Sequence, residues 1–218
     1  TLTVNQNTLT GNHTNENGFG HGYGGGIYNA GTLTVNQSTL TGNRVDGAGN
    51  PGFGGGIDND GTLTVNQSTL TGNHAADTGA GLGRGGGIYN RGSLNLLNSI
   101  VAGNSTGNID GGYDAGANNL INAVPLLAPL GNYGGPTPTM PPLPGSPAIN
   151  GCTSGSSFAT DQRGAGFLRP IGPFADIGAV EVQAPIVWNT LNSGDGSLRD
   201  AISNAPAGAI ITFSNNLS

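Results

Sequence analysis

The sequence predicts an all-β fold, a right-handed parallel β-helix with three short strands per coil, and three observations carry that prediction. A twelve-residue block recurs along the chain, a glycine-rich hexapeptide precedes three of its copies, and apolar residues alternate with polar ones inside the block. The block stands at 1–12, 32–43, 62–73 and, in degenerate form, 93–104, so one period is about 30 residues. A propeller blade needs about 40 residues and four strands, so the period favours a β-helix over a propeller or a sandwich.

Each period supplies its three strands in a fixed order. Ile27, within the glycine-rich hexapeptide, predicts the first strand. Leu33 and Val35 alternate with threonines, which is the pattern of a second strand with one buried face, and Leu40 between two threonines predicts a third. Because strands this short are marginal alone, we expect them to stack on their copies in the next coil and bury a continuous core. Right-handed connections are the default between parallel strands.

Asparagines follow these strands at repeating positions. They are Asn29, Asn59 and Asn90 after the glycine-rich strand, and Asn12, Asn43, Asn73 and Asn104 after the threonine-rich one. We expect them to take the left-handed bends of coil corners and to form amide ladders between coils, with Asn29, Asn59, Asn90, Asn43 and Asn73 as the ladder residues. This structural role is preferred over ligand binding. It is also preferred over glycosylation, because glycans at 36–38 and 66–68 would crowd on successive coils.

Three variable segments separate the repeated blocks, at 13–23, 44–53 and 74–84. They leave each coil at the same point, so we expect loops that cluster on one face, which in a solenoid is often the binding face. Their exposed aromatic residues are the candidates for such binding: Phe19, Tyr23 and Phe53. Tolerated surface insertion is the alternative interpretation.

No metal, cofactor or catalytic site is predicted from these segments. His13 and His74 hold equivalent positions, but they are two coils apart, ~9.6 Å, and Arg44 lies between them. Asp58 and Asp60 lack carboxylates at the matching positions of the other coils, so they are expected to be ordinary solvent-facing carboxylates rather than calcium ligands.

The repeat stops after residue 104 and the composition changes. Residues 105–185 are rich in proline and glycine, with scattered apolar residues, and are expected to form a loop-rich cap that ends the β-helix. Their charge-dense group consists of Asp161, Arg163, Asp176 and Glu181. A catalytic acid pair is conceivable there, but an ion-pair network that ties the cap to the end of the helix is the preferred interpretation.

Four stretches of this region resemble the choice-of-anchor Q region of bacterial cell-surface proteins. They are LAPLGNYGGPTPTMPPLPGSPAIN at 127–150, ATDQRG at 159–164, RPIG at 169–172 and DIGAVEV at 176–182. Those proteins carry the region directly after β-helix repeats of the type seen here, and the resemblance covers about residues 24–182. It implies an extracellular or cell-surface setting and no catalytic residue. Asn150 departs from the family, which usually has Asp at that position, so a role of charge there is not implied for this chain.

Residues 186–218 form a third part of the chain. A short strand, a helix opened by the capping box at 197–200, and a second strand are expected, and the stretch resembles the beginning of a β-helix. We expect this segment to complete the first coil of the next copy, and folding back onto the coil at Thr1 of the same chain is the alternative. Its predicted assembly residues are Trp188, Leu198, Ile202, Ile210 and Phe213.

Composition excludes several classes of function. Glycine contributes 42 residues and proline 13, a composition near that of disordered chains, but here many of the glycines are periodic. All 6 basic residues are arginines, scattered singly in a chain of net charge −6, which argues against nucleic-acid binding. No apolar run approaches the ~18 residues of a membrane helix, and a signal peptide is either absent or already removed before Thr1. A single cysteine, Cys152, excludes an internal disulfide.

The predicted function is therefore structural. We expect an extracellular β-helix module that assembles head-to-tail or in tandem into a surface filament, stalk or layer, with further copies of itself as partners. The alternative is an adhesin that holds surface glycans, other cells or a partner through the variable segments. An enzyme that degrades polysaccharides is the least favoured reading, because the repeat faces carry Thr, Asn and Gly and the chain has no lysine base.

Overall fold

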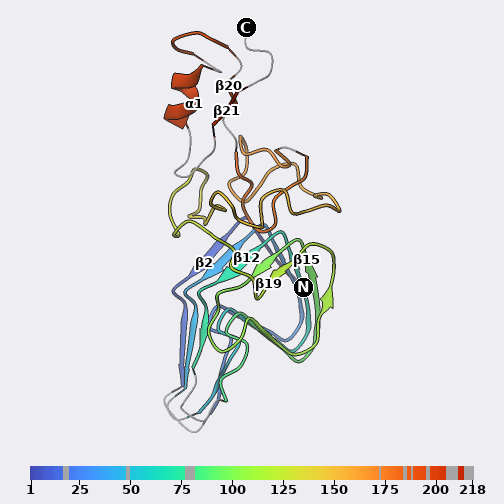
Figure 1. Cartoon of the computed structure of the whole chain (residues 1–218). Coiled ribbons are helices and arrows are strands. Elements are labelled where there is room, and N and C mark those ends of the chain that lie inside the picture. The colour runs from blue at the N-terminus through green and yellow to red at the C-terminus, as the bar shows by residue number, and fades with distance from the viewer. Residues whose placement is uncertain are drawn as a thin grey trace.

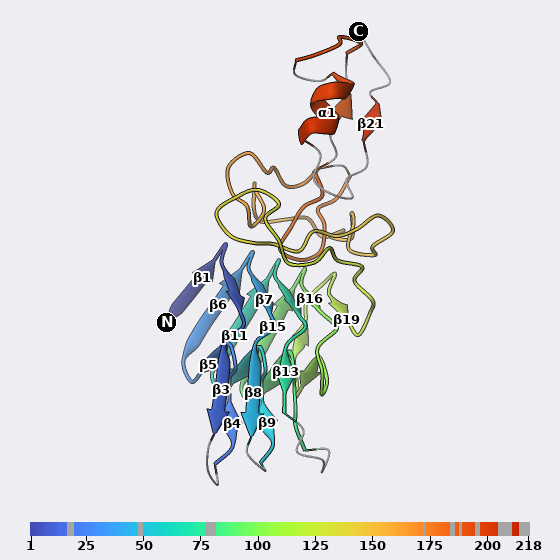
Figure 2. The same ribbon diagram turned by 90° about the vertical axis from the view of Figure 1, so that its left-hand side faces the viewer.

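The computed structural model describes residues 1–16, 20–47, 50–76, 82–171, 173–183, 186–187, 189–194, 197–204 and 211–213. These residues form an all-β structure dominated by parallel sheets, with one short helix, α1 (Leu198–Asn204). Figure 1 looks along the stack of strands, and Figure 2 shows successive periods side by side.

Each period contributes one strand to each of three parallel sheets. The first sheet contains β1 (Leu2–Asn5), β6 (Thr32–Asn36), β11 (Thr62–Asn66), β15 (Ser93–Leu97) and β18 (Asp114–Ala115). The second contains β5 (Ile27–Asn29), β10 (Ile57–Asn59), β14 (Ile88–Asn90) and β17 (Ile109–Asp110). The third contains β2 (Thr8–Thr10), β7 (Thr39–Thr41), β12 (Thr69–Thr71), β16 (Ile100–Val101) and β19 (Leu120–Ile121).

The strands pair with identical residues in register. Leu63 of β11 pairs with Leu33 of β6, and Leu70 of β12 pairs with Leu40 of β7. Since side chains alternate between the two faces of a strand, this register places every apolar position of the repeat on the inside. The fully or nearly fully buried core consists of Leu33, Val35, Leu40, Ile57, Leu63, Val65, Leu70, Ile88, Leu94, Leu96 and Val101.

The variable segments are more regular than the loops that the sequence predicts. β3 (His13–Glu16), β8 (Arg44–Gly47) and β13 (His74–Ala75) form a fourth parallel sheet, and β4 (Gly22–Tyr23) pairs with β9 (Gly52–Phe53). The expectation of only three strands per period was therefore wrong for the first three periods. The backbone of these segments stays in register with the next period. Segments with different sequences therefore still form ladder hydrogen bonds.

The stacking also continues past residue 104, where the sequence repeat ends. β17, β18 and β19 lie within 105–121 and add one more strand to each of the three main sheets. Leu120 pairs with Ile100, only 20 residues earlier, so this last period is shortened. The boundary expected at 104 was placed too early, because stacking needs alternating apolar positions and a matching backbone rather than a conserved block.

The corners after the first sheet bend at residues other than the ladder asparagines. Left-handed backbone occurs at Gln6, Gln37, Gln67 and Asn98, with φ between 44° and 52°. These four residues follow the strands of the first sheet at equivalent positions. Asn29, Asn59 and Asn90 are not among the residues with positive φ, so the expectation that they supply left-handed bends was wrong.

Residues 122–183 lie along one row of corners rather than over the end of the stack (Figures 1 and 2). Gln6 Nε2 of the first period donates to the carbonyl of Asp161 at 2.8 Å. In later periods Thr69 Oγ1 accepts from the N–H of Ala179, and the carbonyl of Asn98 accepts from Gly178. The expected end cap is therefore a strap that contacts successive periods from the side.

The third part of the chain forms a small unit of its own. β20 (Ile186–Val187) and β21 (Thr212–Phe213) pair with each other in parallel, and α1 packs beside β20. Both ribbon views place this unit beyond the strap and away from β1, so its described residues do not cover the first period of the same chain (Figures 1 and 2). Among the described residues, no helix is long and apolar enough to cross a membrane.

Candidate binding surface

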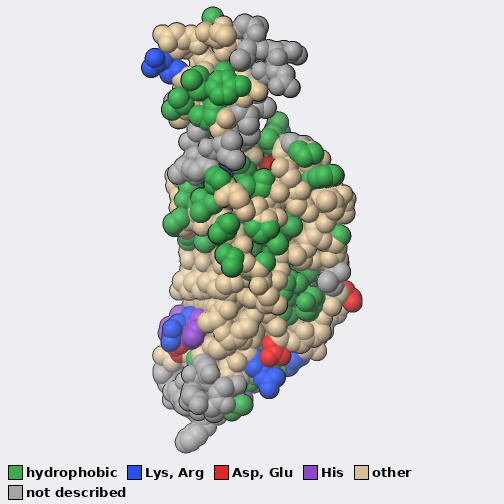
Figure 3. Space-filling model, viewed as in Figure 1, with side chains coloured by type: hydrophobic (Ala, Val, Ile, Leu, Met, Phe, Trp, Pro, Cys, Tyr) green, Lys and Arg blue, Asp and Glu red, His purple; other side chains and the backbone are tan. Residues whose placement is uncertain are grey.

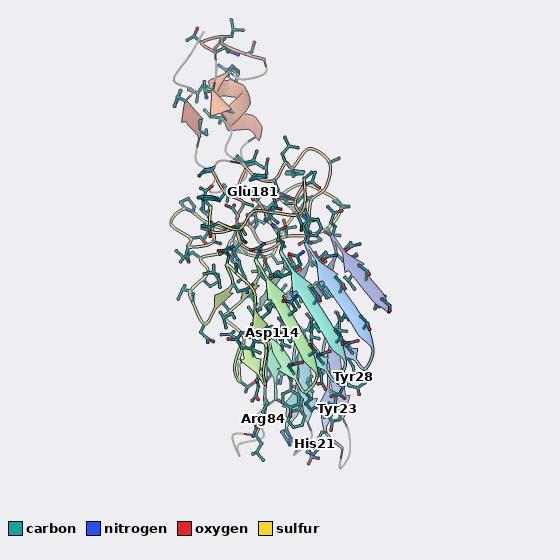
Figure 4. The ribbon with its side chains drawn as sticks, turned by 90° about the vertical axis from the view of Figure 1, so that its right-hand side faces the viewer. His21, Tyr23, Tyr28, Arg84, Asp114 and Glu181 are labelled. Carbon is teal, nitrogen blue, oxygen red and sulfur yellow. The ribbon has the colours of Figure 1, made fainter. Side chains whose placement is uncertain are left out.

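Aromatic side chains from three successive periods gather outside the second sheet. Phe53, at the end of β9, stacks on Tyr23 of β4 with ring centroids 5.7 Å apart, and on Tyr89 of β14 at 4.8 Å. Tyr28 of β5 lies 6.4 Å from Tyr23 in a tilted arrangement, and His21 meets Phe53 edge-on. We use the name aromatic surface for these four rings and the three charged residues beside them. Its members are Tyr23, Tyr28, Phe53, Tyr89, Asp58, Asp60 and Arg91. Figure 4 shows Tyr23, Tyr28 and His21 together at one end of the molecule, opposite Glu181.

Parallel register brings these residues together. Asp58 of β10 pairs with Tyr28 on one side and Tyr89 on the other, so these three outward-facing positions form one row. Tyr23 and Phe53 pair in the same way in the adjoining small sheet. Rows of equivalent positions repeat at the strand spacing of ~4.8 Å, which is the stacking distance of aromatic rings.

Asp58 is buried, which corrects the expectation that it faces solvent. Its side chain has 0% exposure, and its ion-pair partner Arg91 lies 3.4 Å away. Burial raises the pKa of Asp58 from 3.8 to about 6, because removal from water penalises the charged carboxylate more than Arg91 stabilises it, and the charge of Asp60 raises the pKa further.

Arg91 joins the acids to the rings. Its Nε lies 2.6 Å from Asp60 Oδ1, and its guanidinium lies over the rings of Tyr23 at 5.2 Å and Tyr89 at 5.3 Å. The Tyr28 hydroxyl donates to Asp60 Oδ2 at 2.7 Å, and that hydrogen bond is the main reason for the raised pKa of Tyr28. Because a guanidinium carries five N–H donors, these carboxylate contacts leave donors available for a ligand.

The charge-dense group of the strap is a buried network. Arg163 pairs with Asp161 at 2.6 Å, and Arg169 pairs with Glu181 at 3.0 Å, with all four side chains at or below 1% exposure. Burial, and then the charge of Glu181, raise the pKa of Asp176 to about 7. The carboxylates of Asp161, Asp176 and Glu181 accept hydrogen bonds from arginines or from backbone N–H groups, so they hold the strap together rather than present a reactive acid to solvent.

The asparagines form two ladders. Asn29 Nδ2 donates to Asn59 Oδ1 at 2.6 Å, and Asn59 Nδ2 donates to Asn90 Oδ1 at 2.6 Å. Along the other row, Asn43 Nδ2 donates to Asn73 Oδ1 at 2.9 Å, and Asn73 continues to Asn104. Each of these amides also bonds to backbone carbonyls of its neighbours, so the ladders link the periods.

The histidines of the variable segments do not gather around a common centre. His13 Nε2 lies 2.7 Å from Asp46 Oδ2, whereas His74 Nδ1 contacts Ser105 Oγ at 2.5 Å. Arg44 stands between the two histidines in the register and also contacts Asp46. Within the ranges that the structure describes, no group of three or more His, Cys, Asp or Glu could hold a metal ion.

The predicted assembly residues lie on the separate unit. Leu198 is 43% exposed, Ile202 is 58% exposed and Phe213 is 56% exposed, whereas Trp188 and Ile210 lie outside the described residues. Leu198 and Ile202 line a pocket of about 400 Å³ on α1 together with Leu191, Asn192 and Arg199. Figure 3 shows hydrophobic side chains gathered on this unit.

Sequence reasoning found part of the aromatic surface. Tyr23 and Phe53 lie in it, while Phe19 is outside the described residues. Tyr28, Tyr89 and Arg91 were missed as candidates, although Tyr28 and Tyr89 share the fifth position of the hexapeptide, which points outward between the buried Ile and Asn.

Comparison with known proteins does not add an assignment. No protein-family model, curated protein sequence or solved structure matches the chain. The interpretation of its surfaces therefore rests on their own geometry and chemistry.

Proposed function

We propose that the chain is a right-handed parallel β-helix module, of the kind found beside choice-of-anchor Q regions, and that it serves as an extracellular structural element. The support for the fold is the order of the sheets, in which every period adds one strand to each of three sheets in chain order. The low charge and the Thr- and Asn-covered strands suit a solvated surface, and the resemblance of the strap region favours a cell-surface setting.

Two features of the chain support the structural role. The main stack of strands is open at its β1 end, and the separate unit of β20, β21 and α1 is an incomplete stack. β1, β5 and β2 are each the last strand of their sheet, and their far sides have no partner strand among the described residues. Leu2 of β1 is 58% exposed, and Val4 and Leu9 of the same end are only partly buried. An open edge of this type favours pairing with a further strand, from a tandem copy or from another chain.

The separate unit has the complementary form. Ile186 of β20 pairs in parallel with Thr212 of β21, 26 residues later, which is close to the period of the main stack. A two-stranded parallel sheet is only marginally stable alone. The apolar side chains of Leu198 and Ile202, on the helix beside it, are exposed to solvent. We propose that this unit of one copy continues into the β1 end of the next, so that copies join head-to-tail into a filament, stalk or layer.

Gly31 offers a sharp test of this joint. In the next period a Cβ at the equivalent Gly61 would lie 2.0 Å from the Gly31 carbonyl oxygen, so a side chain at this position projects toward the preceding period. At Gly31 a Cβ would meet nothing within 4 Å. Gly31→Ala should therefore leave the single chain stable and obstruct a copy that stacks on the edge strand β5, which ends at Asn29.

The experiment is sedimentation velocity and light scattering over a range of protein concentrations. We expect the unmodified chain to associate as concentration rises, Gly31→Ala to shift association to higher concentration by about tenfold or more, and Ile202→Glu to do the same. Gly112→Ala is the matched control, because its Cβ also meets nothing within 4 Å but lies at the other end of the stack. A compact monomer at every concentration, or equal association of Gly31→Ala and the unmodified chain, would overturn the proposal.

A further inference from the structure

The aromatic surface begins at Tyr28 on the edge strand β5 and extends over two further periods, away from the open end of the stack. Tyr23 is 36% exposed and Tyr28 is 53% exposed, although both belong to a continuous group of stacked rings. Single exposed apolar residues are normal on a soluble protein, whereas a contiguous aromatic patch with a polar rim usually marks an interaction site. Tyrosine in particular combines a broad apolar face with a hydroxyl that can bond to a ligand.

The polar groups at its rim are held in fixed positions. Asp60 receives hydrogen bonds from the Tyr28 hydroxyl at 2.7 Å and contacts Arg91 Nε at 2.6 Å, so one carboxylate orients both donors. Arg91 is held in addition by Asp58 and by the faces of two rings. Groups that are already ordered lose little conformational freedom when a ligand binds, which favours affinity.

The charges of the surface compensate one another. Arg91 faces Asp58 and Asp60, and nearby Arg84 lies 3.6 Å from Asp110. A cationic ligand would compete with Arg91, which already lies over two rings, and an anionic ligand would meet two carboxylates in a chain of net charge −6. The chemistry therefore favours an uncharged ligand that presents both an apolar face and many hydroxyl groups.

We propose that the aromatic surface binds neutral carbohydrate chains. The C–H groups of a pyranose ring would contact the exposed Tyr28 ring and the edges of the stacked rings. The sugar hydroxyls would donate to carboxylates such as Asp60 and accept from the guanidinium of Arg91. The rings of successive periods are spaced at 4.8 and 5.7 Å, comparable to the length of one sugar unit, so neighbouring units of a linear glycan would lie over neighbouring periods. Affinity should consequently rise with oligosaccharide length.

Calorimetric titration of the full chain with soluble neutral oligosaccharides of glucose, mannose, xylose or N-acetylglucosamine tests this inference. We expect saturable binding to at least one series, tightening as the oligosaccharide lengthens. Tyr23→Ala and Phe53→Ala should each weaken that binding by about tenfold or more. Phe174→Ala is the matched control, since Phe174 is 41% exposed on the strap and lies outside the aromatic surface.

Two conservative variants separate binding from folding. Tyr28→Phe keeps the ring and removes the hydroxyl, and Arg91→Lys keeps the charge and removes the planar donor fork. Both should weaken glycan binding while the melting temperature stays close to that of the unmodified chain. The inference is overturned if no neutral series binds, if an anionic polysaccharide binds instead, or if the aromatic-surface variants bind as tightly as Phe174→Ala. Because the readout is ligand binding, failure here leaves the concentration-dependent association of the chain unaffected.

Discussion

Asn59 Nδ2 donates a hydrogen bond of 2.6 Å to Asn90 Oδ1, and this contact joins residues 31 positions apart in sequence through a side chain with 0% exposure. The same amide group bonds to the carbonyl of Ser93 at 3.0 Å, while its oxygen accepts from Asn29. One buried side chain thus satisfies polar groups in three successive periods. The ladder therefore links neighbouring strands.

Replacing Asn59 with Ala should lower the free energy of unfolding by about 2–3 kcal/mol, because buried donors and acceptors in the neighbouring periods lose their partner. Chemical denaturation measures the change. Asn36→Ala is the control: Asn36 Nδ2 also donates to an asparagine, Asn5 Oδ1 at 2.8 Å, but that contact is exposed to water. A loss at Asn59 no larger than at Asn36 would contradict the role of the buried ladder.

Gly61→Ala should destabilise the chain by about 1–3 kcal/mol or more, because its Cβ would lie 2.0 Å from the Gly31 carbonyl oxygen and the two backbones would have to separate. Gly31→Ala, at the equivalent position one period earlier, should change stability by less than about 0.5 kcal/mol at low protein concentration. Thermal unfolding of the two variants side by side measures the difference. Equal melting temperatures would argue against the close approach of these strands.

Arg169→Met should cost about 3–5 kcal/mol, because the buried Glu181 carboxylate would lose its guanidinium partner at 3.0 Å. Arg84→Met is the comparison, since Arg84 pairs with Asp110 at 3.6 Å with both side chains well exposed, and its loss should cost less than about 1 kcal/mol. Urea titration of both variants gives the values. Similar losses for the two would show that the strap network contributes no more than a surface pair.

The stability of the chain should depend on the protonation of Asp58. Its pKa in the folded chain is about 6, above the ordinary 3.8, so the folded state binds this proton more tightly than the unfolded state. The resulting contribution to stability is complete below pH 3.8 and is lost as the pH rises through 6. Asp58→Asn cannot titrate, so its stability relative to the unmodified chain should increase by about 2–3 kcal/mol between pH 4 and 7. A difference that stays constant across this range would refute the assignment.

Cys152 should react slowly with thiol reagents in the native chain. Its side chain is fully buried, its Sγ contacts the carbonyl of Asp176 at 3.2 Å, and burial raises the pKa of the thiol to about 12. Because the thiolate is the reactive form, labelling should require unfolding of the strap. Absorbance during reaction with an aromatic disulfide reagent, with and without denaturant, measures both rates. Rapid complete labelling of the native chain would contradict this burial.

The periodic part of the chain was predictable because local pattern and tertiary contact agree there. Leu33, Val35 and Leu40 alternate with polar residues at the period of a strand, and in the structure all three are buried against their copies. The candidate site was only partly predictable. Tyr23 and Phe53 were recognised as candidates, but their contact with Tyr89 and Arg91 joins different periods through strand register.

The sequence by itself determined the all-β class, the period and the apolar positions, because a repeat with two-residue alternation fixes which side chains face a common interior. Only the tertiary structure decided which polar side chains become buried. Asp58 and Asn59 are neighbours in an exposed-looking hexapeptide, yet both are closed off by residues from adjacent periods. The strap likewise lies beside the stack because it bonds to residues such as Thr69 and Asn98. These partners are more than 70 residues away in sequence from the strap residues that they contact. Such contacts depend on three-dimensional register, which no local pattern specifies.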